Sequence, residues 1–222
     1  MTETVPALLD ELAGLGDPKM LAVNQRHGDD HSVNLTKLRA VAKRVKTNQP
    51  LALELWETEN TNARLLALLV CKPKEFTQEQ LDTMLRYART PKVQDWLVNY
   101  VVKKSNHKEN LREVWFADAD PVVASAGWAL TTERVIKSPD GIELVGLLDL
   151  IESDMKDAQS RLQWAMNETL ANIGIYHEDL RARALDIGER LEVLKDYPTP
   201  PNCTSPFAPI WINEMVRRLG TK

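Results

Sequence analysis

The sequence has few of the residues that build disulfide scaffolds and metal sites. Only two of its 222 residues are cysteine, and Cys71 and Cys203 lie far apart without the spacing of metal ligands. This pattern excludes a disulfide scaffold and a zinc site, and it indicates a reducing compartment. The four histidines are scattered along the chain. We therefore expect no metal, no cofactor and a cytoplasmic location.

Long apolar runs and nucleotide motifs are also missing. No window approaches the 18 consecutive apolar residues that a membrane-spanning helix needs. Residues 1–14 carry acids rather than a basic run before an apolar stretch, which argues against a secretory signal. There is no glycine-rich phosphate loop and no Gly-x-Ser-x-Gly elbow. We expect no membrane partner.

The charge is close to balanced overall but unevenly distributed. The chain is 43% hydrophobic and 27% charged, an ordinary globular balance, with a formal net charge of −4. Residues 34–112 carry 15 lysines and arginines against eight acids, a net of +7, between ends of −4 and −7. Such a segment could steer an anionic polymer, or it could be a set of ordinary solvated helix faces.

Most segments repeat apolar residues at the three- and four-residue steps of a helix. Leu35 to Val45 shows this pattern, and a helix over residues 76–88 has Thr77 as its expected cap. Pro91 suits the start of a helix that runs through Trp96 to Lys103. Further helices are expected at residues 51–57, 63–71, 111–116, 121–135, 142–153, 158–173, 178–194 and 210–219. No alternating run predicts a strand.

One stretch, residues 197–209, departs from the helical rhythm because it holds five prolines. Elsewhere about a dozen helices are joined by short turns, which predicts an all-α fold. Helix pairs of about 40 residues are typical of HEAT and armadillo repeats. We expect one HEAT/armadillo-like helical-repeat solenoid, an α-α superhelix, over residues 1–222. A compact helical bundle is the alternative, because the repeats are only weakly similar to one another.

Two stretches resemble a known family. The first is Asn34-Leu-Thr-Lys-Leu-Arg-Ala-Val-Ala-Lys-Arg, followed by Leu51-Ala-Leu-Glu-Leu-Trp-Glu and Ala63-Arg-Leu-Leu-Ala. The second is Trp164-Ala-Met-Asn-Glu-Thr-Leu-Ala-Asn-Ile-Gly-Ile-Tyr, followed by Cys203-Thr-Ser-Pro-Phe-Ala-Pro. In this order they resemble the DNA alkylation repair family, AlkD-like glycosylases built from HEAT-like repeats. The resemblance implies a surface for double-stranded DNA and, in active members, removal of cationic alkylated purines without a metal.

The resemblance also implies four site positions: a Trp, an Asp four residues later, an Arg on a following helix and another Trp. Trp96 matches the first, and Tyr100 stands where the family keeps its Asp. Asn99 and Asp95 are the nearest polar neighbours, and a one-residue slip would put Asn99, which is not a carboxylate, at the Asp position. A tyrosine is neutral at pH 7, so it cannot supply the carboxylate that stabilises the developing charge on the sugar.

The other two positions also differ from the family pattern. The Arg position falls near Ala124 or Ser125, and the second Trp falls near Glu168, one turn after Trp164. Asp95 or Glu168 could replace the missing acid, or each could be an ordinary surface acid. Trp96 could face DNA, or it could be core, because Val93, Trp96, Leu97 and Tyr100 share a helical face.

Basic residues near these positions are the candidates for phosphate contacts. They are Arg39, Lys43, Arg44, Arg64, Lys92, Lys103, Lys104, His107, Lys108 and Arg112. We expect a monomeric DNA-binding helical-repeat protein, and whether it keeps glycosylase activity is left open because the family Asp and Arg positions are not kept. The alternatives are an active alkylpurine glycosylase with different residues, and a protein-interaction solenoid without catalysis.

Overall fold

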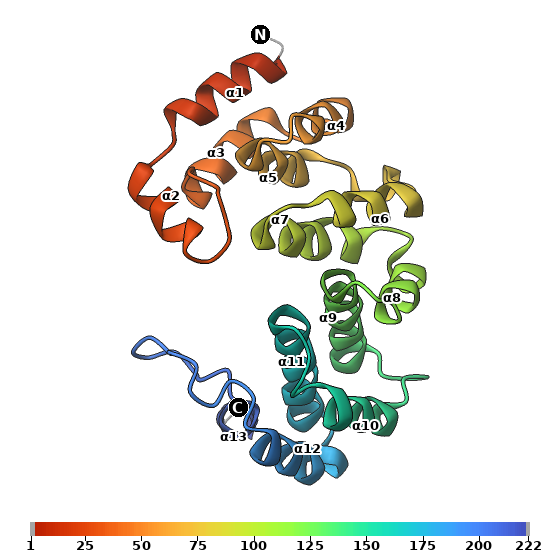
Figure 1. Cartoon of the computed structure of the whole chain (residues 1–222). Helices are drawn as coiled ribbons and strands as arrows, with labels where there is room; N and C mark the ends of the chain where they lie inside the picture. The colour runs from red at the N-terminus through yellow and green to blue at the C-terminus, as the bar shows by residue number, and fades with distance from the viewer. Residues whose placement is uncertain (1–2, 221–222) are drawn as a thin grey trace. The chain divides into compact units, whose positions relative to one another are not determined.

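The computed structural model describes residues 3–220. Within that range all regular structure is helical, apart from one isolated bridge between Gly16 and Val33 (Figure 1). The expected all-α class is therefore confirmed. None of the helices in this range is both long and apolar enough to cross a membrane.

The chain forms two compact units, Met1–Lys108 and Glu109–Lys222. Each unit has its own core of buried apolar side chains. The extent of one repeat domain over residues 1–222 stays a prediction, and the two units are described separately.

The first unit is built from short helices that begin at polar caps. Its elements are α1 Val5–Gly14, α2 Pro18–Gln25, α3 Leu35–Val45, α4 Gln49–Glu57, α5 Thr61–Val70, η1 Pro73–Glu75, α6 Gln78–Tyr87, α7 Pro91–Trp96, η2 Leu97–Val101 and η3 Val102–Lys104. Asn34 and Asn60 each accept a hydrogen bond from the first turn of the helix they precede. Thr77 and Gln80 form the capping box that the sequence predicts.

Helix α5 is the centre of the first unit. It packs against α3, α4 and α7, and nearly all of its residues are buried. Leu65 and Leu66 on α5 have no exposed surface, and neither have Leu38 on α3 and Leu55 on α4. The almost wholly apolar sequence of this helix predicts that position, because a helix without a polar face must be covered on all sides.

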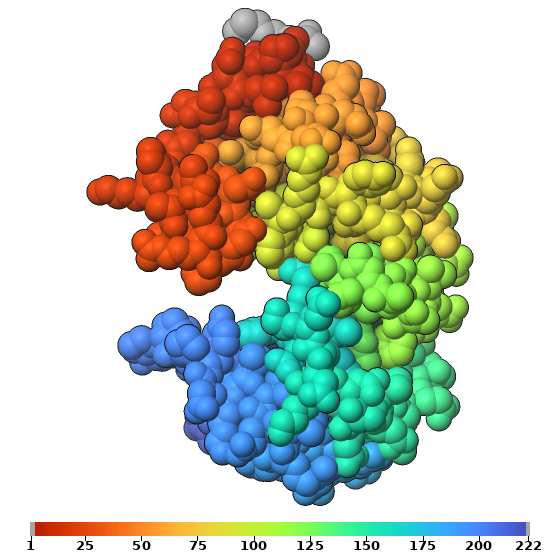
Figure 2. Space-filling model, viewed as in Figure 1, coloured from red at the N-terminus to blue at the C-terminus, as the bar shows by residue number. Residues whose placement is uncertain are grey.

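The second unit contains longer helices. They are α8 Lys108–Phe116, which begins one residue before the unit, α9 Pro121–Lys137, α10 Leu144–Asp154, α11 Ser160–Tyr176, α12 Glu178–Leu191 and α13 Ala208–Gly220. Helix α11 packs against α9, α12 and α13, and its face holds Met166, Leu170 and Ile173. Figure 2 shows the proline-rich segment between α12 and α13 projecting from this unit.

The structure differs from the sequence prediction at two places. Helices α1 and α2 lie before residue 34, in a stretch to which the sequence prediction assigns no helix bounds. The helix expected to run from Pro91 to Lys103 is regular only as far as Trp96 and continues as the π-helix η2 and the 3₁₀ turn η3. The amide of Val102 points to both Leu97 O and Val98 O, so the turn holds one residue more than an α-turn.

Candidate nucleic-acid interface

Trp96 lies at the junction between α7 and the π-helix η2. The side chain is 7% exposed, and Val93 and Leu97 beside it are also buried. Of the two interpretations of Trp96 that the sequence leaves open, DNA-facing or core, this burial favours the core. Part of the indole ring nevertheless faces polar groups, because the guanidinium of Arg39 and the phenol of Tyr100 contact it. Wide π-turns of this kind occur frequently at functional sites.

Four side chains form what we call the aromatic–cation cluster: Arg39, Trp96, Tyr100 and Lys104. The Arg39 guanidinium lies 5.1 Å from the centroid of the Trp96 ring, and its Nη2 donates to the Tyr100 hydroxyl at 3.3 Å. The rings of Trp96 and Tyr100 meet edge to face with centroids 5.0 Å apart. Lys104 Nζ lies 5.7 Å from the Tyr100 ring. Such contacts hold cations over aromatic faces.

The cluster presents positive charge to solvent over an aromatic base. Arg39 and Lys104 are exposed, Tyr100 is half-buried and Trp96 is buried. No carboxylate contacts Arg39 or Tyr100 in the described part of the chain. An exposed guanidinium and ammonium without a paired acid can bind phosphate oxygens without first breaking an ion pair.

The candidates for the missing carboxylate are placed differently. Asn99 is exposed and accepts a hydrogen bond from Lys103 Nζ at 2.7 Å, so its amide belongs to a surface contact. Asp95 is also exposed, on the last turn of α7. Glu168 is half-buried on α11 in the second unit. None of the three is a member of the aromatic–cation cluster.

Most of the other predicted phosphate contacts lie at the surface. Lys43 is exposed, while Lys92, Lys103 and Lys108 are half-buried. Arg44 is exposed but makes ion pairs with Glu3 and Glu11, which raise the pKa of its guanidinium. A phosphate at Arg44 would have to compete with these two carboxylates.

Arg64, a predicted phosphate contact, lies in the interior of the first unit. Its side chain is buried, stacked 4.8 Å from the Trp56 ring centroid. Nε donates to Trp56 O and Nη1 to Tyr87 O, both at 3.2 Å. The guanidinium therefore joins the ends of two helices and is not available to DNA. The sequence signal was its position within an apolar helix, where a charge is retained only if it is hydrogen-bonded.

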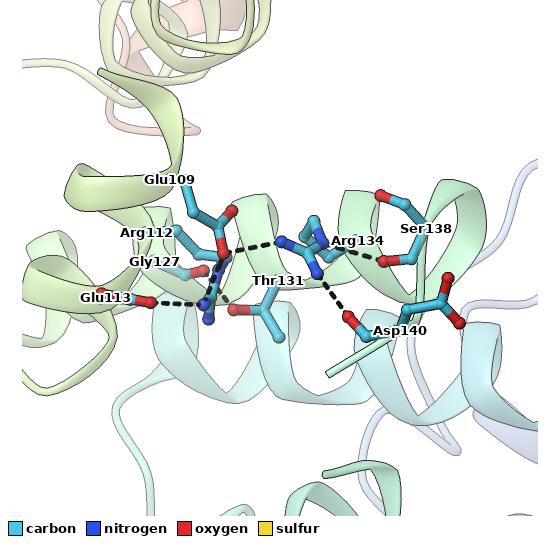
Figure 3. Close-up of polar contacts among 8 residues, drawn as sticks. All are labelled: Glu109, Arg112, Glu113, Gly127, Thr131, Arg134, Ser138 and Asp140. Atoms are coloured by element: carbon cyan, nitrogen blue, oxygen red, sulfur yellow. Dashed lines mark hydrogen bonds and ion pairs between the residues drawn. The ribbon is translucent and has the colours of Figure 1, made fainter. Parts of the chain in front are cut away.

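The second unit holds an arginine that the sequence prediction did not single out. Arg134 on α9 donates to Glu109 Oε1 at 2.8 Å, to Ser138 O at 2.9 Å and to Asp140 O at 2.7 Å (Figure 3). Arg112, a predicted phosphate contact, is 14% exposed and pairs with Glu109 and Glu113 (Figure 3). Arg134 links α9 to α8, and Arg112 forms its ion pairs within α8, so neither replaces the family arginine.

The two positions expected for the family arginine hold residues that are neither basic nor exposed. Ala124 and Ser125 are both buried in α9, and the Ser125 hydroxyl donates to Val122 O. Trp164, one turn before Glu168, is half-buried and meets Tyr197 edge to face with centroids 5.0 Å apart. The described residues include no group of three potential metal ligands.

Comparison with known proteins identifies the family. The sequence model of the DNA alkylation repair enzyme family matches residues 8–212. The chain belongs to this family. Two curated relatives are similar: the uncharacterized protein Lin0241 of Listeria innocua, 23% identical over 98% of this chain and 99% of its own, and the uncharacterized protein Lmo0209 of Listeria monocytogenes, 24% identical over 82% and 84%.

A solved structure supports the fold of this family member. It is described as a new family of proteins related to the HEAT-like repeat DNA glycosylases with affinity for branched DNA structures. It superposes with a TM-score of 0.76 over 97% of this chain and 95% of its own, at 22% identity. The HEAT-like helical-repeat fold is therefore confirmed. In this DNA alkylation repair family member, position 100 holds a hydroxyl bonded to an arginine, and no carboxylate.

Proposed function

We propose that this protein binds double-stranded and branched DNA through the aromatic–cation cluster and does not excise alkylated bases. The observation that carries the proposal is the contact of Arg39 with both Trp96 and Tyr100. This contact holds the Arg39 guanidinium at the surface. The guanidinium also donates a hydrogen bond to the Tyr100 hydroxyl, which lies at the position where a catalytic carboxylate would be needed. The cluster thus keeps groups for binding and lacks the group for bond cleavage.

The missing carboxylate bears directly on catalysis. Glycosidic cleavage builds positive charge on the sugar, and a preorganised anion stabilises that charge. Loss of one such electrostatic partner costs on the order of 100- to 1,000-fold in rate. At this position Tyr100 offers a hydroxyl in place of a carboxylate, and the neighbouring positive charge of Arg39 would raise the energy of a cationic transition state.

The family and the structural relative support a DNA ligand. The relative's described affinity for branched DNA structures makes a junction the first substrate to test. The basic segment of residues 34–112, which contains the cluster, supplies the electrostatic attraction that such a polyanion requires. Family membership and charge point to the same ligand class.

The test compares affinities of the full-length protein for a four-way junction and a linear duplex at low salt. Arg39→Ala and Lys104→Ala should each weaken binding to both ligands, because each removes a phosphate contact. Lys156→Ala is the matched control, an exposed lysine in the acidic third of the chain, and should leave affinity unchanged. If the protein binds neither the junction nor the duplex detectably at low salt, the proposal is contradicted.

The second arm tests catalysis. The protein is incubated with methylated DNA, and released 3- and 7-methylpurines are measured against the uncatalysed rate. We expect no release above that rate, because Tyr100 stands four residues after Trp96, where the family has an acid. Release that disappears in Asp95→Asn or Glu168→Gln would instead identify an active glycosylase with a relocated acid. Binding of a protein rather than DNA would favour an interaction scaffold.

A further inference from the structure

The second unit contains an aromatic pocket that the site described above does not use. Trp164 from α11, Tyr197 at the start of the proline-rich segment and Trp211 from α13 line a cavity of about 340 Å³. Prolines 198, 200 and 206 form its edges. This volume lies in the range of small-ligand pockets, about 300–1,000 Å³.

The pocket is held open by specific contacts. Asn167 on α11 donates its side-chain amide to Pro206 O at 2.9 Å, which ties the segment to α11. The far end of the segment is fixed against α12 at Gly188, where an added Cβ would lie 2.7 Å from Pro209 Cδ. Phe207 and Ala208, near the end of the segment, are buried. The aromatic rings are therefore positioned before a ligand arrives.

The lining chemistry selects a flat, uncharged group. No charged side chain lines the pocket within the described range. Two hydroxyls at its edge already act as acceptors: Ser205 Oγ accepts from Phe207 N at 3.2 Å, and Thr204 Oγ1 accepts from Arg218 Nη2 at 3.5 Å. Their protons can therefore be donated to a ring nitrogen or carbonyl of a ligand.

A cation lies at the edge of the pocket. Arg218 on the last turn of α13 has 55% of its side chain exposed and reaches Thr204. It also pairs with Glu214 at 2.7 Å, so a phosphate at this guanidinium would have to compete with that carboxylate. A ligand with a flat neutral ring and a neighbouring phosphate would match both the aromatic interior and this guanidinium.

We propose that this pocket binds a single unpaired nucleobase of DNA, stacked on Trp164, with its phosphate near Arg218. The inference rests on the proposed DNA-binding function and assigns it a second contact site. Base–aromatic stacking tolerates any base, because every base has a π-face. The pocket would thus detect an unstacked nucleotide without reading its sequence, as a branched structure requires.

The first test compares two three-way junctions that differ at one position, an unpaired adenosine or an abasic nucleotide. The wild-type protein should bind the adenosine junction about 5- to 150-fold more tightly, the range of base–aromatic stacking. Trp164→Ala should abolish this preference without weakening binding of the abasic junction, and Trp164→Phe should restore part of it. Tyr176→Ala, an exposed aromatic on the same helix, is the control and should keep the preference.

Equal affinity of the wild-type protein for the two junctions would overturn the proposal. So would a Trp164→Ala protein that is folded by circular dichroism and still prefers the adenosine junction. Suppose that Arg39→Ala and Lys104→Ala leave all DNA binding unchanged while Trp164→Ala removes the preference for adenosine. The proposal that DNA binds through the aromatic–cation cluster is then wrong, and the proposal that the pocket binds a nucleobase is supported. The two proposals can therefore fail separately.

The second test does not depend on DNA binding. The full chain is labelled with 5-fluorotryptophan, and its ¹⁹F resonances are followed during titration with adenosine 5′-monophosphate. The Trp164 resonance, assigned by its disappearance in Trp164→Phe, should shift with the nucleotide and not with inorganic phosphate. No shift at Trp164, or a shift with a proline-rich peptide alone, would show that the pocket is not a nucleobase site.

Discussion

Arg64 carries a charge into the interior of the first unit, where its guanidinium is bonded to the carbonyls of Trp56 and Tyr87. Burial lowers the pKa of Arg64, although arginine stays protonated at any pH in a protein. Removing a buried donor leaves its acceptors without partners. At the scale of single residues, Arg64 thus lies in the basic segment of residues 34–112 but is a structural link and not a DNA contact.

Arg64→Ala should lower the free energy of unfolding by about 1–3 kcal/mol, because two buried carbonyls lose their donors and Trp56 loses its stacking partner. Arg89→Ala is the matched control. Its side chain is 69% exposed and pairs with Glu59, so the decrease should be below about 1 kcal/mol. Urea denaturation measures both. Weaker DNA binding by Arg64→Ala at unchanged stability would contradict the structural role.

His31 makes stability depend on pH. The residue is 4% exposed, and its Nε2 lies 3.0 Å from the side-chain amide of Asn24. That amide also bonds to His31 O, so it donates to Nε2 and the proton resides on Nδ1. Burial lowers the pKa of His31. Asp29 and Asp30 oppose this effect, and Lys92 adds to it.

In the unfolded chain His31 takes up a proton as the pH falls through about 6.5, while in the folded chain it stays neutral to lower pH. Over this pH range the unfolded state binds more protons than the folded state. As the pH decreases, His31 therefore lowers the free energy of unfolding by at most about 1.4 kcal/mol per pH unit. His31→Gln should reduce the difference in stability between about pH 7.5 and pH 5.5. The exposed His27→Gln should preserve it. Urea titrations at both pH values measure the effect.

At the scale of elements, the contact of α8 with α9 depends on a glycine. A Cβ added at Gly127 would lie 2.3 Å from Phe116 N and 2.6 Å from Trp115 C, both backbone atoms. Backbone cannot move aside as a side chain can, so the two helices would have to separate. The ion pair of Arg134 on α9 with Glu109 also joins these two helices (Figure 3).

Gly127→Ala should therefore destabilise the protein by about 1–3 kcal/mol or more, despite the better helix propensity of alanine. Gly146→Ala in α10 is the control. Its Cβ would meet only Glu143 Cβ at 3.7 Å, an ordinary contact. It should be neutral or stabilising by up to about 1 kcal/mol. Thermal and urea unfolding of both variants measure the difference, and equal stability of the two would contradict the tight contact.

The π-helix η2 shows why some elements could not be predicted. The apolar spacing from Val93 to Val101 suits a regular helix, and no proline or glycine interrupts it. The fold tolerates the extra residue in this turn because Leu97, Val98 and Val101 are all buried in the π-helix. The caps behave differently: the roles of Thr77 and Asp120 follow from bonds to residues within one turn, which local sequence determines.

At the scale of the whole molecule, charge is concentrated by position along the chain. The +7 of residues 34–112 and the −7 of residues 113–222 cancel in the composition. Electrostatic attraction to a polyanion depends on the local segment and on salt. The formal net charge of −4 therefore does not argue against a DNA ligand.

Salt titration tests this arrangement. Replacing Lys43, Lys92 and Lys104 together by alanine should lower the slope of log affinity against log salt by about 0.9 for each phosphate that is no longer neutralised. Replacing Lys137, Lys156 and Lys195, which lie in the acidic third, changes the net charge equally and should leave the slope unchanged. Equal slopes for the two triple variants would show that binding follows net charge and not the basic segment.

The sequence by itself determined the helical class, most helix starts and the absence of a carboxylate at position 100. These features depend on residue identity and on contacts within a turn or two. Tertiary structure alone decided that Arg39 reaches Tyr100, 61 residues away, that Arg64 is buried, and that Trp164 and Trp211 share a pocket. Side chains so distant in sequence meet only because helices pack, and packing depends on the combined shapes of many residues.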